Sequence, residues 1–239
     1  MSAEIRAVLF DKDGTLIDYA ATWVPTNWLV ARRVAGGDEG LAGTLLAAGG
    51  HDPETDAVRP HSVLSAGSAS DLARLWSPLL GGRDVSALTE VIDQGFLDGV
   101  AASMTTVCDL EPLLSFLRGA GLVLGVATSD SEAAARHNLA LLELEHHFPF
   151  VCGYDSGHGE KPGPGMIEAF CRAVDLPAAA VAMVGDSYHD LEMARAAGAG
   201  LAVGVLTGPA ERGELETQAD VVIADVRGLP SILDLPGFQ

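Results

Sequence analysis

Short apolar runs recur along the chain, and turn residues bound each of them. Continuous rather than alternating hydrophobicity is typical of strands buried on both faces of a parallel sheet. The runs that predict strands are Ala7–Phe10, Leu122–Ala127, Phe148–Cys152, Val181–Val184, Leu201–Leu206 and Val221–Ala224. The helical patterns between them are Glu111–Arg118, Ser131–Leu144, Gly165–Val174 and Asp190–Ala197. This alternation predicts an α/β fold with a doubly wound, mostly parallel sheet.

The interval from Tyr19 to Thr105 departs from this alternation, because it has no convincing buried strand. Its helical patterns are Trp28–Val34, Leu41–Ala48, Ser70–Leu80 and Val85–Met104. The stretch Gly49–Gly67 is rich in glycine, proline and polar residues, so we expect an exposed loop there. The sequence therefore predicts a core domain of residues 1–18 and 106–239, with an α-helical domain of residues 19–105 inserted after the first strand.

The chain of 239 residues carries a formal net charge of −19 at pH 7. So acidic a protein is a poor partner for the phosphate backbone of nucleic acid or for an anionic membrane surface. The N-terminal segment lacks the pattern of a signal peptide, and the longest uncharged stretch, Ala196–Ala210, is too short to span a membrane. The 3 cysteines show no metal-type spacing. We therefore expect a cytoplasmic protein without nucleic-acid or membrane partners, and the sequence indicates no oligomeric state.

Polar side chains gather around the ends of the predicted strands. In chain order they are Asp11, Asp13, Thr128, Ser129, Lys161, Asp186 and Asp190. Taken singly, each has an ordinary explanation, because aspartate and serine often cap helices or stabilise turns. In open α/β sheets, however, functional residues collect at the carboxyl ends of the strands. We therefore expect these side chains to meet in one site.

Together and in this order, these residues resemble the four motifs of the haloacid dehalogenase superfamily of phosphohydrolases. DKDGTL at residues 11–16 resembles the first motif, Thr128 or Ser129 the second, Lys161 the third and GDSYHD at residues 185–190 the fourth. The resemblance covers the core on both sides of the insertion and extends to the phosphoglycolate phosphatase-like branch. It implies that the inserted helical region is the family's cap domain.

The resemblance also implies a Mg²⁺-dependent phosphatase that acts on a small phosphorylated metabolite through an aspartyl-phosphate. Asp11 would be the nucleophile and would bind the metal with its other carboxylate oxygen. Asp13 would protonate the leaving alcohol, later activate the water, and offer its backbone carbonyl to the metal. Asp186 would be a second carboxylate ligand, and Asp190 would support the metal site.

Thr128, Ser129 and Lys161 would hold the phosphoryl oxygens on the same model, because phosphoryl transfer depends mostly on positioning and charge neutralisation. In the cap, Arg59 and His61 flank a proline in the expected exposed loop. They are candidates for reading the leaving group, and a solvated loop is an equal alternative.

Lys12 departs from the resemblance, since many members carry an apolar residue between the two aspartates. On extended backbone, successive side chains point to opposite faces. We therefore expect Lys12 to point away from the site and to contribute through water or a surface ion pair. A direct contact with the substrate is the alternative.

Other functions stay open beside the phosphatase. A phosphomutase of the β-phosphoglucomutase type shares all four motifs and passes the phosphoryl group to a sugar instead of water. A non-catalytic binding protein on the same fold is disfavoured, because all four motifs are retained. A phosphonate hydrolase that uses a Schiff base is excluded, because it would need a lysine in the cap and the only lysines in the sequence, Lys12 and Lys161, lie outside residues 19–105.

Overall fold

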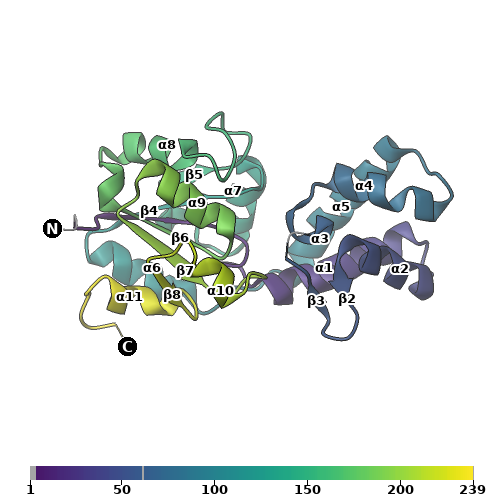
Figure 1. The fold of residues 1–239 in the computed structure, drawn as a ribbon, viewed down its shortest axis with the longest axis horizontal. Coiled ribbons are helices and arrows are strands. Elements are labelled where there is room, and N and C mark those ends of the chain that lie inside the picture. Colours follow the sequence, from purple (N-terminus) through teal and green to yellow (C-terminus); the bar gives the residue numbers. More distant parts are fainter. Residues whose placement is uncertain (1–3, 61, 239) are drawn as a thin grey trace. The chain divides into compact units, whose positions relative to one another are not determined.

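The computed structural model describes residues 4–60 and 62–238, and the chain divides into two compact units (Figure 1). The first unit combines Met1–Asp18 with Thr106–Gln239, and the second is Tyr19–Thr105. We call them the α/β unit and the helical unit. In the described part of the chain, no helix is both long and apolar enough to cross a membrane.

A parallel sheet forms the centre of the α/β unit. Its 6 strands lie in the order β5-β4-β1-β6-β7-β8, and every neighbouring pair is parallel. Their bounds are β1 Ala7–Phe10, β4 Val123–Ala127, β5 Phe150–Cys152, β6 Val181–Gly185, β7 Leu201–Val205 and β8 Val221–Ile223. The chain adds β4 and β5 on one side of β1 and then β6 to β8 on the other. The topological switch point, where α/β proteins bind ligands, therefore lies at the carboxyl end of β1.

Helices cover both faces of this sheet, as Figure 1 shows. They are α6 Leu110–Gly119, α7 Glu132–Leu141, α8 Gly165–Val174, α9 Tyr188–Ala197, α10 Arg212–Leu215 and α11 Leu229–Ile232. Short 3-10 turns occur at Glu145–His147, Ala178–Ala180 and Val226–Gly228. Side chains of α6 and α7 pack on one face, and side chains of α8 and α9 pack on the other. The predicted doubly wound α/β fold is confirmed.

The central strand β1 shows why its sequence is continuously apolar. Val8 and Phe10 pack in the cluster that contains Leu113 of α6, whereas Ala7 and Leu9 pack in the cluster on the opposite face. All residues of β1 are buried. A strand covered on both faces has no position for a solvated side chain, so hydrophobicity does not alternate along it.

The helical unit has a core of its own. Its elements are α1 Tyr19–Val34, α2 Glu39–Gly49, β2 His51–Asp52, β3 Ala57–Val58, α3 Val63–Ala66, α4 Ala69–Trp76, a 3-10 turn at Pro78–Leu80, and α5 Val85–Ser103. Apolar side chains of α1, α2, α4 and α5 form a separate buried cluster. Trp76 lies fully buried in it, and its indole N–H donates to the carbonyl of Leu45 at 2.8 Å. The buried indole thus packs its ring in the core while its polar N–H is satisfied.

Two features of the helical unit differ from the sequence prediction. Helix α1 begins at Tyr19 rather than near Trp28, although Pro25 lies inside it. Proline lacks a backbone donor and disfavours a helix interior, so the pattern alone underestimates this helix. The expected exposed loop Gly49–Gly67 contains the β2–β3 hairpin and α3, and His51 within it is buried against a tryptophan ring.

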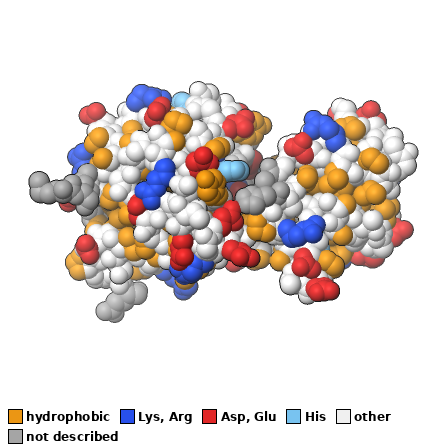
Figure 2. All heavy atoms as spheres, viewed as in Figure 1, with side chains coloured by type: hydrophobic (Ala, Val, Ile, Leu, Met, Phe, Trp, Pro, Cys, Tyr) orange, Lys and Arg blue, Asp and Glu red, His pale blue; other side chains and the backbone are white. Residues whose placement is uncertain are grey.

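Acidic and basic side chains differ in how they are spread over the surface. Figure 2 shows acidic groups spread over the visible face of each unit, with basic groups in isolated spots. Several arginines are paired with carboxylates, as Arg195 is with Asp220 and Arg33 is with Asp98. The visible face therefore offers no broad basic patch of the kind that binds nucleic acid.

The contact between α1 and α5 depends on a glycine of α5. A Cβ on Gly99 would lie 2.7 Å from Cγ2 of Thr26, a buried residue whose hydroxyl donates to the carbonyl of Thr22. Because Thr26 cannot rotate without losing that bond, we expect Gly99→Ala to lower the free energy of unfolding by about 1–3 kcal/mol. Gly43→Ala in α2 is the control: its Cβ would meet nothing within 4 Å, so it should raise stability by about 0.5–1 kcal/mol. Urea unfolding measures both, and equal stabilisation by the two substitutions would contradict this packing.

Candidate active site

The carboxyl ends of β1 and β6 bring two aspartates to one place. Asp11 follows β1 directly, and its backbone N–H donates to the carbonyl of Val184 in β6 at 2.8 Å. Asp186 follows β6 in the same way. Both side chains are buried. Because parallel strands end at a common edge, residues far apart in sequence meet at the switch point at the end of β1.

Asp190 completes a cluster of buried carboxylates. One carboxylate oxygen from each of Asp11, Asp186 and Asp190 lies within 4.8 Å of the others. Asp190 belongs to the first turn of α9, where Ser187 is the N-cap and donates its hydroxyl to Asp190 Oδ2 at 2.6 Å. Since Ser187 is the cap, helix capping does not account for Asp186. The start of α9 instead orients Asp190 toward the strand ends.

Lys161 lies among these carboxylates. Its Nζ is 2.5 Å from Asp11 Oδ1 and 2.6 Å from Asp190 Oδ1, and its side chain is 3% exposed. Burial alone would lower the pKa of Lys161, but the carboxylates of Asp11 and Asp190 outweigh burial and raise it. The lysine is therefore charged, and it links the end of β1 to α9.

The three carboxylates outnumber this one ammonium, and the pKa values of two of them are raised. Burial raises the pKa of Asp11 to about 7; Asp190 adds to this rise, and Lys161 opposes it. Burial, with the nearby Asp11 charge, also raises the pKa of Asp186 well above its ordinary value. Carboxyl groups with pKa values raised in this way resist ionisation. When all three carboxylates are ionised, the single positive charge of Lys161 therefore does not balance them.

The backbone approaches Asp186 closely at two glycines. A Cβ on either Gly14 or Gly208 would collide with Asp186 Oδ2. Gly14 also has a φ of +83°, which residues with side chains disfavour. The hydroxyl of Thr207 donates to the carbonyl of Gly14 at 2.5 Å and joins the loop after β7 to the loop after β1.

Sequence reasoning missed Ser187, Thr207 and Gly208 as parts of this site. A usable signal exists for two of them, since Thr207 and Gly208 directly follow the predicted strand Leu201–Leu206. A polar residue and a glycine at the carboxyl end of a strand near the switch point are typical of a site loop. Ser187 lies inside the GDSYHD signature, in which only Asp186 and Asp190 were expected site residues.

The cluster fits a divalent cation that prefers oxygen ligands. Mg²⁺ takes carboxylate oxygens, carbonyl oxygens and water, and the three aspartates supply carboxylate oxygens close together. Added positive charge would also offset the burial that raises the pKa of Asp11 and of Asp186. The donor set and its charge therefore suit the predicted magnesium site.

Lys12 is placed differently from the prediction. Its side chain is fully buried, and its Nζ lies 2.6 Å from Asp13 Oδ2 and 3.4 Å from Asp130 Oδ2. Burial alone would lower the pKa of Lys12, but Asp13 and Asp130 outweigh burial and raise it. The expectation of water or a surface partner is wrong, because carboxylates from two neighbouring strand ends enclose the ammonium. Asp130 was not among the expected site residues.

Thr128 and Ser129 follow β4 at the same edge of the sheet. The N–H of Thr128 donates to the carbonyl of Cys152 at 3.0 Å, and its hydroxyl accepts from the N–H of Asp130 at 3.1 Å. Thr128 is buried, whereas Ser129 is exposed. Ser131 is the N-cap of α7, so Ser129 lies outside that helix.

The two candidates in the helical unit stay predictions. Arg59 is exposed, and its guanidinium donates to the carbonyl of Ala47 at 3.4 Å. Its backbone N–H donates to the carbonyl of Gly50. His61 lies outside the described residues.

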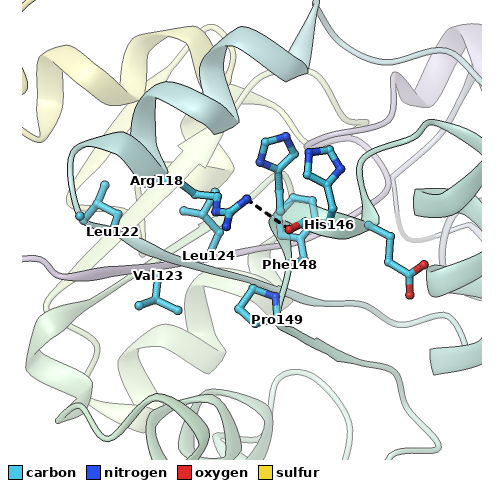
Figure 3. A pocket seen from close by; sticks show the side chains of 10 residues that line it. Arg118, Leu122, Val123, Leu124, His146, Phe148 and Pro149 are labelled. Carbon is cyan, nitrogen blue, oxygen red and sulfur yellow. Dashed lines mark hydrogen bonds between the residues drawn. The ribbon is translucent and has the colours of Figure 1, made fainter.

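A pocket of the α/β unit lies away from this cluster (Figure 3). Its lining includes Arg118, Leu122, Val123, Leu124, His146, His147, Phe148 and Pro149. Leu122, Val123 and Leu124 lie at the amino end of β4, opposite the carboxyl edge where functional groups of such sheets collect. The guanidinium of Arg118 points toward the turn and donates to the carbonyl of His146 at 3.2 Å.

His146 and His147 line this pocket and lie close to Glu111, and the three side chains are candidates for a second metal centre. His147 Nε2 lies 2.7 Å from Glu111 Oε2. The Nδ1 atom of this buried ring finds no hydrogen-bond partner among the described residues. Histidines that bind metals almost always donate from the second ring nitrogen. We therefore interpret the group as a histidine–carboxylate pair.

Similarity to known proteins extends over most of the chain. Residues 5–198 match the family model of haloacid dehalogenase-like hydrolases. A phosphoglycolate phosphatase of Xylella fastidiosa (strain 9a5c) is 32% identical over 198 residues, which cover 81% of this chain and 77% of that protein. An N-acetylmuramic acid 6-phosphate phosphatase of Pseudomonas aeruginosa is 26% identical over 236 residues, covering 96% and 95%. The solved structure of a candidate beta-phosphoglucomutase from Thermotoga maritima is 20% identical, with a TM-score of 0.74, and covers 98% of this chain and 100% of that one.

The raised pKa of Asp11 has a consequence for stability. Folding raises it from an ordinary value of 3.8 to about 7, so between these pH values the folded state binds more protons than the unfolded chain. This group therefore lowers the free energy of unfolding as the pH rises through that window. We therefore expect the free energy of unfolding of Asp11→Asn, measured in chelator, to increase relative to that of wild type as the pH rises from about 4 to about 7. Thermal unfolding across the window measures this, and a pH-independent difference between the two proteins would contradict the raised pKa.

Proposed function

The chain belongs to the haloacid dehalogenase-like hydrolase family and is a phosphatase, and we propose that it hydrolyses a small phosphorylated metabolite with Mg²⁺ through an aspartyl-phosphate. The observation that carries the proposal is the buried cluster of Asp11, Asp186 and Asp190 at the switch point. A phosphate monoester is a stable dianion, so its hydrolysis needs charge neutralisation and a well-placed nucleophile.

Asp11 is the nucleophile in this proposal. A carboxylate oxygen of Asp11 attacks phosphorus, and the bond from phosphorus to the alcohol oxygen breaks. Water then attacks the phosphorus of the aspartyl-phosphate, which releases inorganic phosphate and restores the carboxylate. The contact of Lys161 with Asp11 Oδ1 supports this role, because it orients the nucleophile in a buried place.

Asp13 carries the proton. It gives a proton to the leaving alcohol in the first step and takes one from water in the second. Its side chain is 22% exposed, two residues beyond the buried nucleophile. A partly exposed carboxyl group at this position can exchange protons with substrate and water.

Lys161, Thr128 and Ser129 hold the phosphoryl oxygens. The ammonium of Lys161 already contacts the nucleophile, so it also lies near a group bound there. Bound Mg²⁺ would neutralise phosphoryl charge and orient the phosphate. The carboxylates of Asp11 and Asp186 and the backbone carbonyl of Asp13 would hold the ion, with Asp190 in support.

Phosphoglycolate is the first candidate substrate, because the relative from Xylella fastidiosa carries that activity in its name. The Pseudomonas aeruginosa relative is named for a phosphorylated sugar acid. Both names fall in the class of small phosphorylated metabolites. A phosphomutase would use the same motifs and is the second candidate.

The helical unit is proposed as the cap that selects the substrate, with Arg59 and His61 as candidate contacts.

The free thiols of Cys108, Cys152 and Cys171 support an activity in the reducing cytoplasm.

The direct test is phosphate release by the purified protein from phosphoglycolate, N-acetylmuramic acid 6-phosphate and glucose phosphates. We expect release with Mg²⁺, loss of release in a chelator, and recovery when excess Mg²⁺ is added, because the single ammonium of Lys161 does not balance three carboxylates and a phosphate dianion. Undiminished turnover in chelator would sink the metal assignment. A phosphorylated sugar isomer without free phosphate would favour the phosphomutase.

Substitutions of the two aspartates of DKDGTL should impair catalysis in different ways. Asp11→Asn should abolish turnover of every substrate, because an amide is a poor nucleophile. Asp13→Asn should lower kcat/KM, which covers the steps through formation of the aspartyl-phosphate, about 10²–10⁴-fold on an alkyl phosphate. It should lower kcat/KM far less on 4-nitrophenyl phosphate, whose leaving group departs without a proton. Hydrolysis of the aspartyl-phosphate should be slowed with both substrates, because Asp13 activates the water in that step. Steady-state kinetics on both substrates separate the roles, and near wild-type rates for Asp11→Asn would show that the nucleophile is another residue.

A further inference from the structure

Lys12 and Lys161 are the only lysines in the sequence, and the proposed chemistry uses just one of them. Lysines of an acidic protein ordinarily lie on its surface, where they aid solubility. Here the side chains of Lys12 and Lys161 are 0% and 3% exposed. Burying an ammonium is costly unless carboxylates face it. The partners of Lys12 therefore indicate what the residue is for.

We propose that Lys12 is a positioning residue for Asp13: its buried ammonium holds Asp13 Oδ2 and thereby fixes the carboxyl group that transfers the proton. The inference rests on the proposed role of Asp13 as proton carrier. Lys12 contacts neither substrate nor metal in this account, and it acts through the side chain that follows it.

The backbone of Lys12 gives the ammonium a fixed base. The carbonyl of Lys12 accepts from the N–H groups of Leu16 and Ile17 at 2.9 and 3.0 Å. The N–H of Gly14 donates to the carbonyl of Ile17 at 2.7 Å. These bonds close the DKDGTL segment into a tight loop, so the lysine stem starts from a rigid position.

The far end of the lysine is held by Asp130 in the loop after β4. Lys12 Nζ lies 3.4 Å from Asp130 Oδ2. Asp130 Oδ1 accepts from the N–H of Ser131, and its carbonyl accepts from the N–H of Tyr154 at 3.0 Å. The ammonium is therefore held between two anchored loops, and Asp13 docks on it at 2.6 Å.

The chemistry of proton transfer explains why Asp13 needs such a support. A general acid has to lie within hydrogen-bond reach of the leaving oxygen, and small misplacements cost large factors in rate. Asp13 is partly exposed, and the contact of its Oδ2 with Lys12 Nζ at 2.6 Å restricts the orientation of its carboxyl group.

Two rival roles make different predictions. If Lys12 contacted the phosphoryl group, its loss would slow all substrates alike, as loss of Lys161 should. If Lys12 only neutralised buried charge, its loss would lower the stability of the protein. Any accompanying loss of rate would then be the same for all leaving groups. A positioning role makes the loss of kcat/KM depend on the leaving group, because kcat/KM covers the steps through formation of the aspartyl-phosphate, and in these steps only a basic alkoxide needs the proton of Asp13.

The test compares Lys12→Met, which keeps the length of the side chain, with Lys161→Met as the matched lysine. On phosphoglycolate, or the alkyl phosphate that the panel identifies, Lys12→Met should lower kcat/KM about 10–100-fold. On 4-nitrophenyl phosphate the loss of kcat/KM should stay below about 3-fold. Lys161→Met should lower kcat/KM on both substrates by similar large factors. Lys12→Gln keeps a donor for Asp13 and should show a milder form of the same pattern.

The double variant Lys12→Met/Asp13→Asn gives the sharpest readout. If Lys12 acts only through Asp13, the double variant should be no slower than Asp13→Asn alone on the alkyl phosphate. Circular dichroism confirms folding, and Lys12→Gln carries the test if Lys12→Met does not fold. Equal losses on the two substrates, or additive losses in the double variant, would overturn the inference.

Failure of the inference differs from failure of the proposed function. A wild-type protein that releases no phosphate from any substrate refutes the function and, with it, the inference. Asp13→Asn without leaving-group dependence refutes the role of Asp13, on which the inference rests. A leaving-group effect in Asp13→Asn that is absent from the folded Lys12 variants refutes the inference alone.

Discussion

Crowded negative charge at the end of β1 is the constraint on which the rest of the site depends. Asp11, Asp186 and Asp190 are buried with carboxylate oxygens within 4.8 Å of one another, and Lys161 is the ammonium that contacts two of them. Burial among like charges raises the pKa of Asp11 and of Asp186. An arrangement that is unfavourable on its own would become useful with a divalent cation, because the two positive charges of the ion would offset the negative charge by which three carboxylates exceed one lysine.

The fold supplies this crowding through its topology. Parallel strands β1 and β6 end side by side, and the chain reverses its direction of winding at this point. Gly14 and Gly208 let the backbone close on Asp186, and the capping serine of α9 turns Asp190 inward. The strand edge, two glycines and a helix N-terminus thus build the site from short local features, each of which has an ordinary structural cause.

Much of this architecture follows from the sequence because its causes are local. The observed bounds of β1 and α8 coincide with the predicted ones, since continuous burial and helical periodicity leave clear patterns. Helix α1 was underestimated because Pro25 breaks the pattern without breaking the helix. The burial of Lys12 was out of reach for a different reason: its partner Asp130 lies in another loop, and only the pairing of β1 with β4 brings the two together.

The proposed binding of a cation by the carboxylate cluster can be measured without substrate. Isothermal titration of Mg²⁺ into the wild-type protein, repeated near pH 7 in buffers of different ionisation enthalpy, counts the ions bound and the protons released. The account predicts saturable binding with release of protons. The pKa of Asp11 is raised to about 7, so the cation must displace protons that the carboxyl groups hold near this pH. Asp186→Asn should weaken the binding strongly. Absence of binding, or binding that releases no protons, would contradict the account.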